Sequence, residues 1–255
     1  MAEFNTMELM LVAASRILQN KATVAVGTGA PLAASMLAQK THAPDLVIMF
    51  ESGGIAPIME KMPVSVGDSR SYHRAVMASG LSEIMENCQR GLVDYTFLGG
   101  AQIDMYGNLN STVVGDWEKP KVRFPGSGGA NDFASFCWRV LVITPQDPKR
   151  FVEKVSFITS PGYLDGPGGR EKAGLPAKTG PYKVITNMAI LGYDEQTCRM
   201  RVESIHEGYT FSQVQQNCGF PLLQAKKIVT TSPPAKTDLE ILRREVDPKR
   251  LIIGR

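Results

Sequence analysis

Two short apolar runs on either side of a helical pattern constrain the fold of this chain more than any other feature. "TVAV" at 23–26 and "DLVIMF" at 45–50 have the composition of buried strands. Between them, Pro31 suits the first turn of a helix that continues through "PLAASMLAQK". A strand, a helix and a second strand in such close succession predict a parallel α/β unit.

The alternation continues along the chain. The other expected elements are a helix at 7–18 with Thr6 as a cap, a helix at 81–91, strands at 92–98 and 139–144, antiparallel strands at 182–193 and 199–206, and a last helix through about Glu245 that a Thr237/Glu240 capping box begins. No low-complexity linker divides the chain. We therefore predict a single domain over 1–255 with an α/β fold, an open, mostly parallel sheet and helices on both faces.

Composition excludes several classes of function. Lys and Arg exceed Asp and Glu by 28 to 25, a net charge of +3, which is too small to predict nucleic-acid binding. The three histidines lie far apart and no cysteines have metal-binding spacing, so we expect no metal site. No apolar run approaches the ~20 residues that span a bilayer, and the N-terminus does not resemble a signal peptide, so we expect a cytoplasmic protein without membrane contacts.

The loops after the strands indicate where a ligand binds, because open α/β sheets bind ligands at the carboxyl ends of their strands. Three strands end in glycine or polar loops: "VGTG" at 26–29, "FESGG" at 50–54 and "FLGGAQIDMYGNLNST" at 97–112. A fourth segment, "RFPGSGGANDFAS" at 123–135, is a glycine loop before a possible helix start. Glycines let backbone N–H groups approach a ligand, although each loop is also compatible with a simple turn.

Glu51 has three interpretations at this level. It could bind a ribose in a dinucleotide fold, with Gly27-Thr28-Gly29 holding a pyrophosphate, but Leu32 stands where the third glycine of that fingerprint belongs. It could be a nucleophile or base, because a carboxylate at a strand end, followed by small residues, is accessible to a substrate. It could also be a surface residue in a turn. The octapeptide "VIMFESGG" alone does not decide between them.

A longer pattern resembles a known family. "ESGG", "FLGGAQIDMYGNLNSTVVGDWEKPKVRFPGSGGAND" and "ITSPGYLDGPGGREKAGLP" occur in this order. Together they resemble the family I CoA-transferases, and among these the B (beta) subunits of the glutaconate CoA-transferase type. The similarity extends over nearly the whole chain, from "VGTGAPLAAS" to "REVDP". The shorter glutamate motif and the "GxGGAxD" loop, here 126–132, are shared with the related 3-oxoacid CoA-transferases.

The resemblance implies that Glu51 is catalytic. In this family the glutamate carboxylate attacks the thioester carbonyl of an acyl-CoA, which gives an acyl–glutamyl anhydride and CoA thiolate. The thiolate then attacks the glutamyl carbonyl and leaves a glutamyl-CoA thioester on the enzyme. A second carboxylic acid enters, and the steps run backward with the acids exchanged. The expected reaction is CoA transfer between an acyl-CoA, such as acetyl-CoA or glutaconyl-CoA, and an acid such as glutaconate.

Other residues acquire expected roles from the same resemblance. The loop of Gly126, Ser127, Gly128, Gly129 and Ala130 is expected to bind CoA and the oxyanion, with the N–H groups of Gly128 and Gly129 as the best oxyanion donors.

Four further residues, Gln102, Asn108, Ser52 and Gly53, are candidates for orienting the substrate. The two amides have loop stabilisation as an equal alternative. Asp104 could equally be a turn residue that satisfies local N–H groups. For Arg170 a structural salt bridge is favoured over a substrate carboxylate or a CoA phosphate.

The family also implies partners. We expect a separate A (alpha) subunit of similar fold, a hetero-oligomer of αβ pairs, CoA esters as substrates without a tightly bound cofactor or metal, and a place in amino-acid fermentation. Relatives that are ring-opening hydrolases or a decarboxylase lack the glutamate in this subunit, so the presence of Glu51 favours a transferase. The alternative is an acyl-CoA hydrolase, or a transferase for a different acid, on the same fold.

Overall fold

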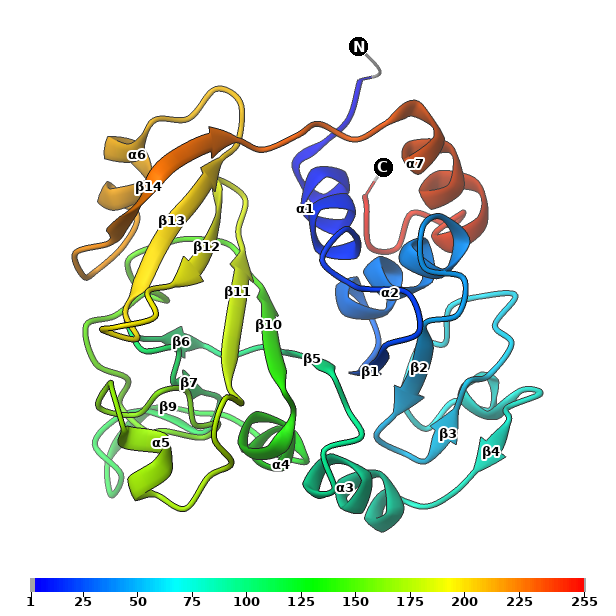
Figure 1. Cartoon of the computed structure of the whole chain (residues 1–255), viewed down its shortest axis with the longest axis horizontal. Helices are drawn as coiled ribbons and strands as arrows, with labels where there is room; N and C mark the ends of the chain where they lie inside the picture. Colours follow the sequence, from blue (N-terminus) through cyan, green and yellow to red (C-terminus); the bar gives the residue numbers. More distant parts are fainter. Residues whose placement is uncertain (1–2, 255) are drawn as a thin grey trace. The chain divides into compact units, whose positions relative to one another are not determined.

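The computed structural model describes residues 3–254, whose contacts cluster into two compact units (Figure 1). The first unit takes the chain up to Phe97 and again from Ser232 onward, and the second is Leu98–Thr231. We predicted one domain because no linker is visible in the sequence. Within residues 3–254, no helix has the length and apolar character to cross a bilayer.

The first unit contains a sheet with the strand order β5-β1-β2-β3-β4. Strands β1, β2 and β5 run parallel, as predicted, whereas β3 is antiparallel to both β2 and β4. Its elements are α1 (Thr6–Ser15), β1 (Thr23–Val26), α2 (Ala30–Lys40), β2 (Val47–Phe50), β3 (Gly54–Ile55), the 3₁₀ turn η1 (Ser69–Tyr72), β4 (Met77–Ala78), α3 (Leu81–Gln89), β5 (Tyr95–Leu98), α7 (Lys236–Ile241) and the π-helical turn η2 (Leu242–Val246).

The helices of the first unit begin at identifiable caps. Pro31 lies in the first turn of α2, as predicted. Helix α1 is capped by Asn5 rather than by Thr6: the Asn5 side chain accepts from the N–H of Glu8, and the Glu8 carboxylate accepts from the N–H of Asn5. This capping box satisfies two backbone donors that the first helical turn leaves open.

The predicted capping box of the last helix is out of place. Helix α7 begins after Ala235, whose N–H donates to the Asp238 carboxylate at 3.2 Å. The predicted pair, Thr237 and Glu240, therefore lies within the helix. Thr, Asp and Glu side chains lie close together here, and the sequence alone did not show which of them closes the box.

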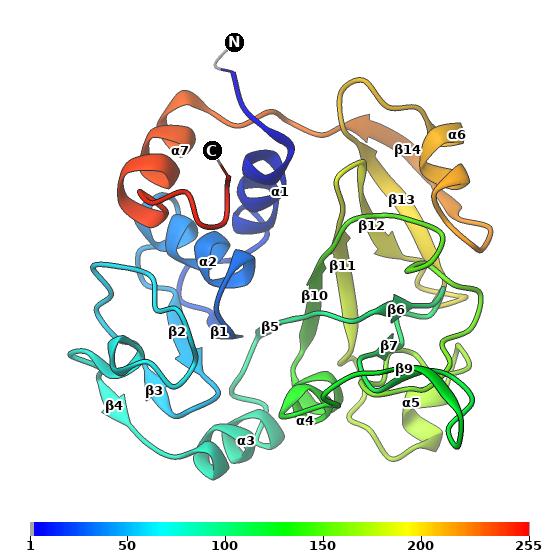
Figure 2. The ribbon, with the colours of Figure 1, turned by 180° about the vertical axis from the view of Figure 1, so that it is seen from behind.

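In the second unit the strands follow the order β14-β13-β12-β11-β10 (Figure 2). Strand β6 pairs with β7, and β8 pairs with β9, in two separate two-stranded sheets. Its elements are β6 (Gln102–Ile103), β7 (Leu109–Asn110), β8 (Val113–Gly115), β9 (Pro120–Arg123), α4 (Ala130–Phe136), β10 (Arg139–Ile143), α5 (Gly169–Lys172), β11 (Pro181–Ile185), β12 (Ala189–Tyr193), β13 (Met200–Ile205), α6 (Phe211–Gln216) and β14 (Leu223–Thr230).

The antiparallel pairing predicted late in the chain is confirmed, but the segment 182–193, which we predicted as one strand, is two strands joined by a turn. The apolar segment at 182–193 forms β11 and β12, which pair antiparallel, and β13 pairs antiparallel with β12. The turn between β11 and β12 forms because the Thr186 hydroxyl accepts from the N–H groups of Met188 and Ala189. Strand β14, parallel to β13, was not predicted, because polar residues interrupt its apolar ones and no long apolar run results.

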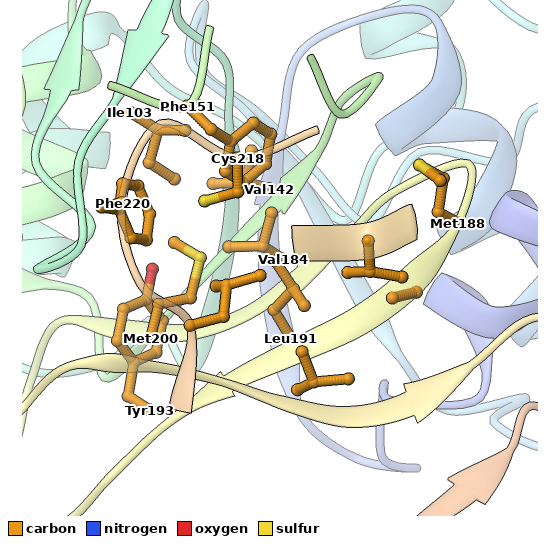
Figure 3. Close-up of a cluster of buried hydrophobic side chains, with 14 of the residues drawn as sticks. Ile103, Val142, Phe151, Val184, Met188, Leu191, Tyr193, Met200, Cys218 and Phe220 are labelled. Carbon is orange, nitrogen blue, oxygen red and sulfur yellow. The ribbon is translucent and has the colours of Figure 1, made fainter. Parts of the chain in front are cut away.

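Buried side chains from several strands of the second unit form its core (Figure 3). Val142 of β10, Val184 of β11 and Leu191 of β12 lie at its centre. The rings of Phe151 and Phe220 pack beside them with centroids 6.4 Å apart. This core provides a rigid base for the loops that carry the predicted site residues of this unit.

Candidate functional site

Glu51 lies in the short connection between β2 and the antiparallel β3, two strands that Figure 1 labels. Strand β2 ends at the fully buried Phe50, whose carbonyl accepts from the N–H of Gly53 at 2.9 Å. This hydrogen bond makes Glu51 and Ser52 the central residues of a β-turn. Glu51 is half-buried. A strand from the core thus ends at a carboxylate that remains accessible.

A glycine loop lies at the same sheet edge as Glu51. Strands β1 and β2 are parallel, and Val26 is directly opposite Phe50, so Gly27-Thr28-Gly29 follows β1 where Glu51 follows β2. Helix α2 begins immediately after the loop, and its N-terminus favours negative charge nearby. A Cβ atom on Gly27 would meet no atom within 4 Å, so the space beside the loop is open. The carboxyl edge of the two strands therefore combines a carboxylate with a half-buried glycine loop.

The dinucleotide interpretation of this edge gains no support. Leu32, which replaces the third glycine of the fingerprint, is completely buried in α2. In dinucleotide folds that glycine lets the helix pack closely against the strand. Here an apolar side chain fills the position, in a helix whose residues 32–38 are all buried.

Ser52 and Gly53 are held by the segment 66–79. The Ser52 hydroxyl donates to the carbonyl of Val66 at 2.7 Å, and the Tyr72 hydroxyl donates to the carbonyl of Ser52. The carbonyl of Gly53 accepts twice from Ser79, from its N–H at 3.0 Å and from its hydroxyl at 2.9 Å. The turn that carries Glu51 is therefore fixed by hydrogen bonds on its C-terminal side.

The two glycines after Glu51 serve backbone packing. A Cβ on Gly53 would lie 2.0 Å from the Ser79 carbonyl oxygen, and one on Gly54 would lie 1.9 Å from the Ser71 carbonyl oxygen. Gly53 also has a φ of +120°, which other residues rarely adopt. We predicted that these small residues leave room for a substrate. Instead, neighbouring backbone fills the space where their side chains would be.

The predicted CoA and oxyanion loop belongs to the second unit and precedes α4. The N–H of Gly126 donates to the carbonyl of Ser111 at 3.0 Å, and the N–H of Ala130 donates to that of Ser127 at 2.9 Å, so these two donors are already used. Within residues 3–254, the N–H groups of Ser127 and Gly128 donate no hydrogen bond to a backbone carbonyl. Gly128 has a φ of +49° and Gly126 one of +101°, so the loop follows a path that favours glycine.

Gln102, a predicted orienting residue, stabilises its own loop. It is buried on β6, and its side-chain oxygen accepts from the Asn110 amide at 2.7 Å and from the N–H of Ser156 at 3.0 Å. Asn110 is followed by Ser111, which exchanges hydrogen bonds with Gly126. The β6–β7 hairpin is thereby connected to the start of the glycine loop.

Asn108 has a similar environment and is almost completely buried. Its amide nitrogen donates to the Asp104 carboxylate and to the carbonyl of Leu164, and its oxygen accepts from the N–H groups of Gly162 and Leu164. Asp104 accepts from the N–H of Tyr106, as expected of a turn residue, and burial raises the pKa of its carboxyl. These contacts favour the loop-stabilising alternative for Asn108.

Arg170 does not form the predicted salt bridge. It is 3% exposed on α5, and burial lowers the pKa of its guanidinium. The partners of its guanidinium are the carbonyls of Pro161, Gly162, Ala134 and Ser135 and the hydroxyl of Thr179. The Arg170 guanidinium thus binds neutral oxygens instead of a carboxylate. Helix α5 places it among loop carbonyls, which need hydrogen-bond donors when they are buried.

The sequence analysis missed the residues that hold the Glu51 turn, namely Val66, Tyr72 and Ser79. They lie in a stretch of mixed composition without strand or helix periodicity, so no pattern marks them.

The predicted residues themselves fall into two groups. Glu51, Ser52 and Gly53 share one turn of the first unit, whereas Gln102, Asn108 and the loop 126–130 belong to the second. Within the described chain, no three His, Cys, Asp or Glu residues are placed to hold a metal ion.

Comparison with known proteins gives concordant results. The model of the Coenzyme A transferase family matches residues 7–217. The chain is 41% identical to the B chain of the 3-oxoadipate CoA-transferase of Pseudomonas knackmussii over 95% of this chain and 94% of that protein. It is 38% identical to the B chain of the glutaconate CoA-transferase of Acidaminococcus fermentans over 98% of this chain and 95% of that protein. The crystal structure of glutaconate coenzyme A-transferase from Acidaminococcus fermentans superimposes with a TM-score of 0.93 at 35% identity, over 99% of this chain and 98% of that chain, which confirms the predicted fold.

Proposed function

Because this chain belongs to the Coenzyme A transferase family, we propose that it is the beta subunit of a two-subunit enzyme that moves CoA between an acyl-CoA and a short dicarboxylic acid. Two beta subunits of similar length support the assignment: one comes from a 3-oxoadipate and the other from a glutaconate CoA-transferase. Both of these acids carry two carboxylates. A dicarboxylate is therefore the substrate class that the two relatives have in common.

We assign the covalent step to Glu51. The observation that carries this assignment is its position at the tip of a hairpin whose strand is buried and whose turn is hydrogen-bonded on its far side. A carboxylate held in this way is oriented before the substrate arrives, which lowers the entropic cost of attack. The sequence resemblance to the family supports the same residue.

The reaction conserves every group. The Glu51 carboxylate adds to the thioester carbonyl, the C–S bond breaks, and an acyl–glutamyl anhydride and CoA thiolate form. The thiolate adds to the glutamyl carbonyl and displaces the first acid as its carboxylate, which leaves CoA as a thioester on Glu51. The carboxylate of the second acid then attacks this thioester and displaces CoA thiolate, which gives a new acyl–glutamyl anhydride. The thiolate attacks the acyl carbonyl of that anhydride, which releases the new acyl-CoA and free Glu51.

Each addition creates an oxyanion that needs hydrogen-bond donors. The N–H groups of Ser127 and Gly128, which have no backbone acceptor among residues 3–254, are our candidates, together with that of Gly129. One such donor contributes about 3 kcal/mol to the stability of the transition state. The N–H groups of Gly126 and Ala130 instead maintain the shape of the loop.

The proposal includes an alpha subunit as partner. The first unit exposes several large apolar side chains on one stretch of sequence, namely Ile58, Val64, Val76, Met77 and Leu81. Contiguous apolar surface is typical of protein–protein contacts, and we propose that these residues contribute to such a surface. Assembly into a hetero-oligomer of αβ pairs, a cytoplasmic location and a role in amino-acid fermentation remain predictions.

The function can be tested with the purified complex of this chain and its proposed alpha subunit. Acetyl-CoA and succinyl-CoA serve as donors, and glutaconate, 3-oxoadipate, glutarate and acetate serve as acceptors. We expect transfer to the dicarboxylates and loss of roughly a thousandfold or more in kcat with Glu51→Gln, because a neutral amide is not a nucleophile. Full activity of Glu51→Gln would refute the assignment, and preference for acetate would refute the substrate class.

The alternative, an acyl-CoA hydrolase, gives a different result in the same assay. A hydrolase releases free CoA from the donor without an acceptor, because water resolves the acyl–glutamyl anhydride. We expect CoA release without acceptor to be a small fraction of the rate with acceptor. If the two rates are equal, the enzyme is a hydrolase.

A further inference from the structure

We propose that Tyr72 and Ser79 are positioning residues that orient the catalytic turn of Glu51 through the backbone of Ser52 and Gly53. The inference rests on the proposed function, because it assumes that Glu51 is the nucleophile. Neither residue belongs to the "ESGG" motif, and they follow Glu51 by 21 and 28 residues in the chain. Their role follows from which backbone atoms they contact.

The hydroxyl groups bind the two carbonyls that follow Glu51. Tyr72 donates to the carbonyl of Ser52, which fixes the peptide plane between Ser52 and Gly53. Ser79 donates from its hydroxyl and from its N–H to the carbonyl of Gly53, which fixes the next plane. On the other side of Glu51, the carbonyl of Phe50 accepts from the N–H of Gly53. Rotation of the peptide planes around Ser52 would break this closed set of hydrogen bonds.

Strand pairing brings these hydroxyls into place. Strand β4 pairs antiparallel with β3, with Gly54 opposite Ala78, so Ser79 lies next to Gly53 as a continuation of the ladder. The close backbone contacts at the two glycines bring the segment 71–79 against the turn with no space between them. A displacement of this segment is therefore transmitted directly to the turn.

The segment is itself anchored. The Asp68 carboxylate caps η1 by accepting from the N–H of Arg70, and it also binds the Arg70 guanidinium. The Ser71 hydroxyl donates to the carbonyls of Asp68 and Val66. The Val66 carbonyl also accepts from the Ser52 hydroxyl, so the anchored segment contacts the turn at one further point.

Loss of either hydroxyl should change the position of the Glu51 carboxylate rather than the affinity for the acyl-CoA. An attacking carboxylate that is misplaced by about 1 Å loses on the order of a hundredfold in rate. Removal of one hydroxyl loosens one peptide plane and leaves strands β2, β3 and β4 paired. We therefore expect a lower kcat with an unchanged KM, whereas a merely structural hydroxyl would affect the amount of folded protein.

The test compares Tyr72→Phe, Ser79→Ala and Ser79→Thr in the complex with the alpha subunit. Because a partial loss of orientation costs less than a full 1 Å displacement, we expect Tyr72→Phe and Ser79→Ala each to lower kcat about tenfold, with KM for the acyl-CoA within about twofold of wild type and an unchanged thermal midpoint. The single-turnover rate at which CoA becomes attached to Glu51 should fall by the same factor. Ser79→Thr, which keeps the hydroxyl, should recover kcat to within about threefold of wild type.

Two matched controls isolate the effect. Tyr209→Phe removes an exposed tyrosine hydroxyl in the second unit, and Ser82→Ala removes an exposed serine hydroxyl on α3. Both should retain wild-type kcat. Wild-type kcat in Tyr72→Phe and Ser79→Ala would overturn the inference, and so would losses that parallel a lower thermal midpoint. If Glu51→Gln is inactive in the same series, the proposed function survives that result, whereas an active Glu51→Gln removes both.

Discussion

Gly53 and Ser79 are in direct backbone contact, so that a Cβ atom added to Gly53 would lie 2.0 Å from the Ser79 carbonyl oxygen. Because Gly53 also has a φ of +120°, an alanine there is strained twice, by its conformation and by the collision. The last residue of the Glu51 turn is therefore glycine for reasons of packing. Its replacement changes both stability and activity.

We expect Gly53→Ala to lower the free energy of unfolding by about 1–3 kcal/mol and to abolish most CoA transfer, because β4 and the turn must separate. Urea unfolding of the complex and an initial-rate assay measure the two effects. Gly27→Ala is the stability control, since its Cβ meets nothing within 4 Å. It should change the unfolding free energy by no more than about 0.5 kcal/mol. An equal loss of unfolding free energy in Gly53→Ala and Gly27→Ala would contradict the packing argument.

Arg243 and Glu8 form a bidentate ion pair within the first unit, with Nε–Oε1 at 2.6 Å and Nη2–Oε2 at 2.8 Å. Glu8 is 1% exposed and also closes the capping box of α1. Arg243→Ala leaves this carboxylate buried without its cation, which we expect to reduce stability by about 3 kcal/mol. Chemical unfolding measures the loss.

The neighbouring Arg244 provides the control for this ion pair. It is exposed, and no ion pair involves it within residues 3–254. Arg244→Ala should change stability by less than about 0.5 kcal/mol. If the two arginine variants unfold at the same urea concentration, the buried pair does not contribute as described.

Strands β1 and β2 and the position of Glu51 were predictable from the sequence. Buried parallel strands need apolar residues on both faces, so "TVAV" and "VIMF" stand out as apolar runs, and Glu51 follows directly where the second run ends. The sheet edge at which Glu51 lies then follows from parallel topology alone. The glycine loop before α4 was visible for a similar reason, because its glycines cluster.

The support of the turn was not predictable, because it depends on contacts between backbone groups distant in sequence. Strands β3 and β4 have two residues each, which is too short for any periodicity. Tyr72 and Ser79 act on carbonyl groups, which every residue carries, so no complementary side chain reveals the partner. Arg170 was misjudged for the same reason, because carbonyl oxygens take the place of the expected carboxylate.

His206 should make the stability of the second unit depend on pH. The ring is 2% exposed, with hydrogen bonds to the Thr186 carbonyl and the Thr231 hydroxyl, and burial lowers its pKa. The unfolded chain, with a histidine pKa of about 6.5, therefore binds a proton at a higher pH than the folded protein does. Stability is full above about pH 6.5 and falls as the pH decreases from there toward the folded pKa, by at most about 1.4 kcal/mol per pH unit.

Urea unfolding about one pH unit above and one below the unfolded pKa measures this contribution. His206→Gln removes the titrating group and should weaken the loss of stability on acidification, whereas the exposed His73→Gln should leave it unchanged. A wild-type pH dependence in His206→Gln would show that other groups are responsible.

Asn108 distinguishes loop stabilisation from substrate orientation. Its removal takes one hydrogen-bond donor from the Asp104 carboxylate and leaves the N–H of Gly162 without its acceptor in a buried loop. We expect Asn108→Ala to lower stability by about 2–3 kcal/mol and to leave kcat/KM of the folded enzyme within about threefold of wild type. A large rise in KM for the acid at unchanged stability would instead assign Asn108 to the substrate.

The covalent role of Glu51 is tested most directly by trapping CoA on the protein. The complex is incubated with glutaconyl-CoA or glutaryl-CoA and treated with hydroxylamine, which converts a glutamyl thioester into a hydroxamate, and the peptides are then analysed by mass spectrometry. We predict a hydroxamate on Glu51 that depends on the acyl-CoA and is absent from Glu51→Gln. An unmodified Glu51 in a complex that transfers CoA at its normal rate, or a modification on another residue, would contradict the account.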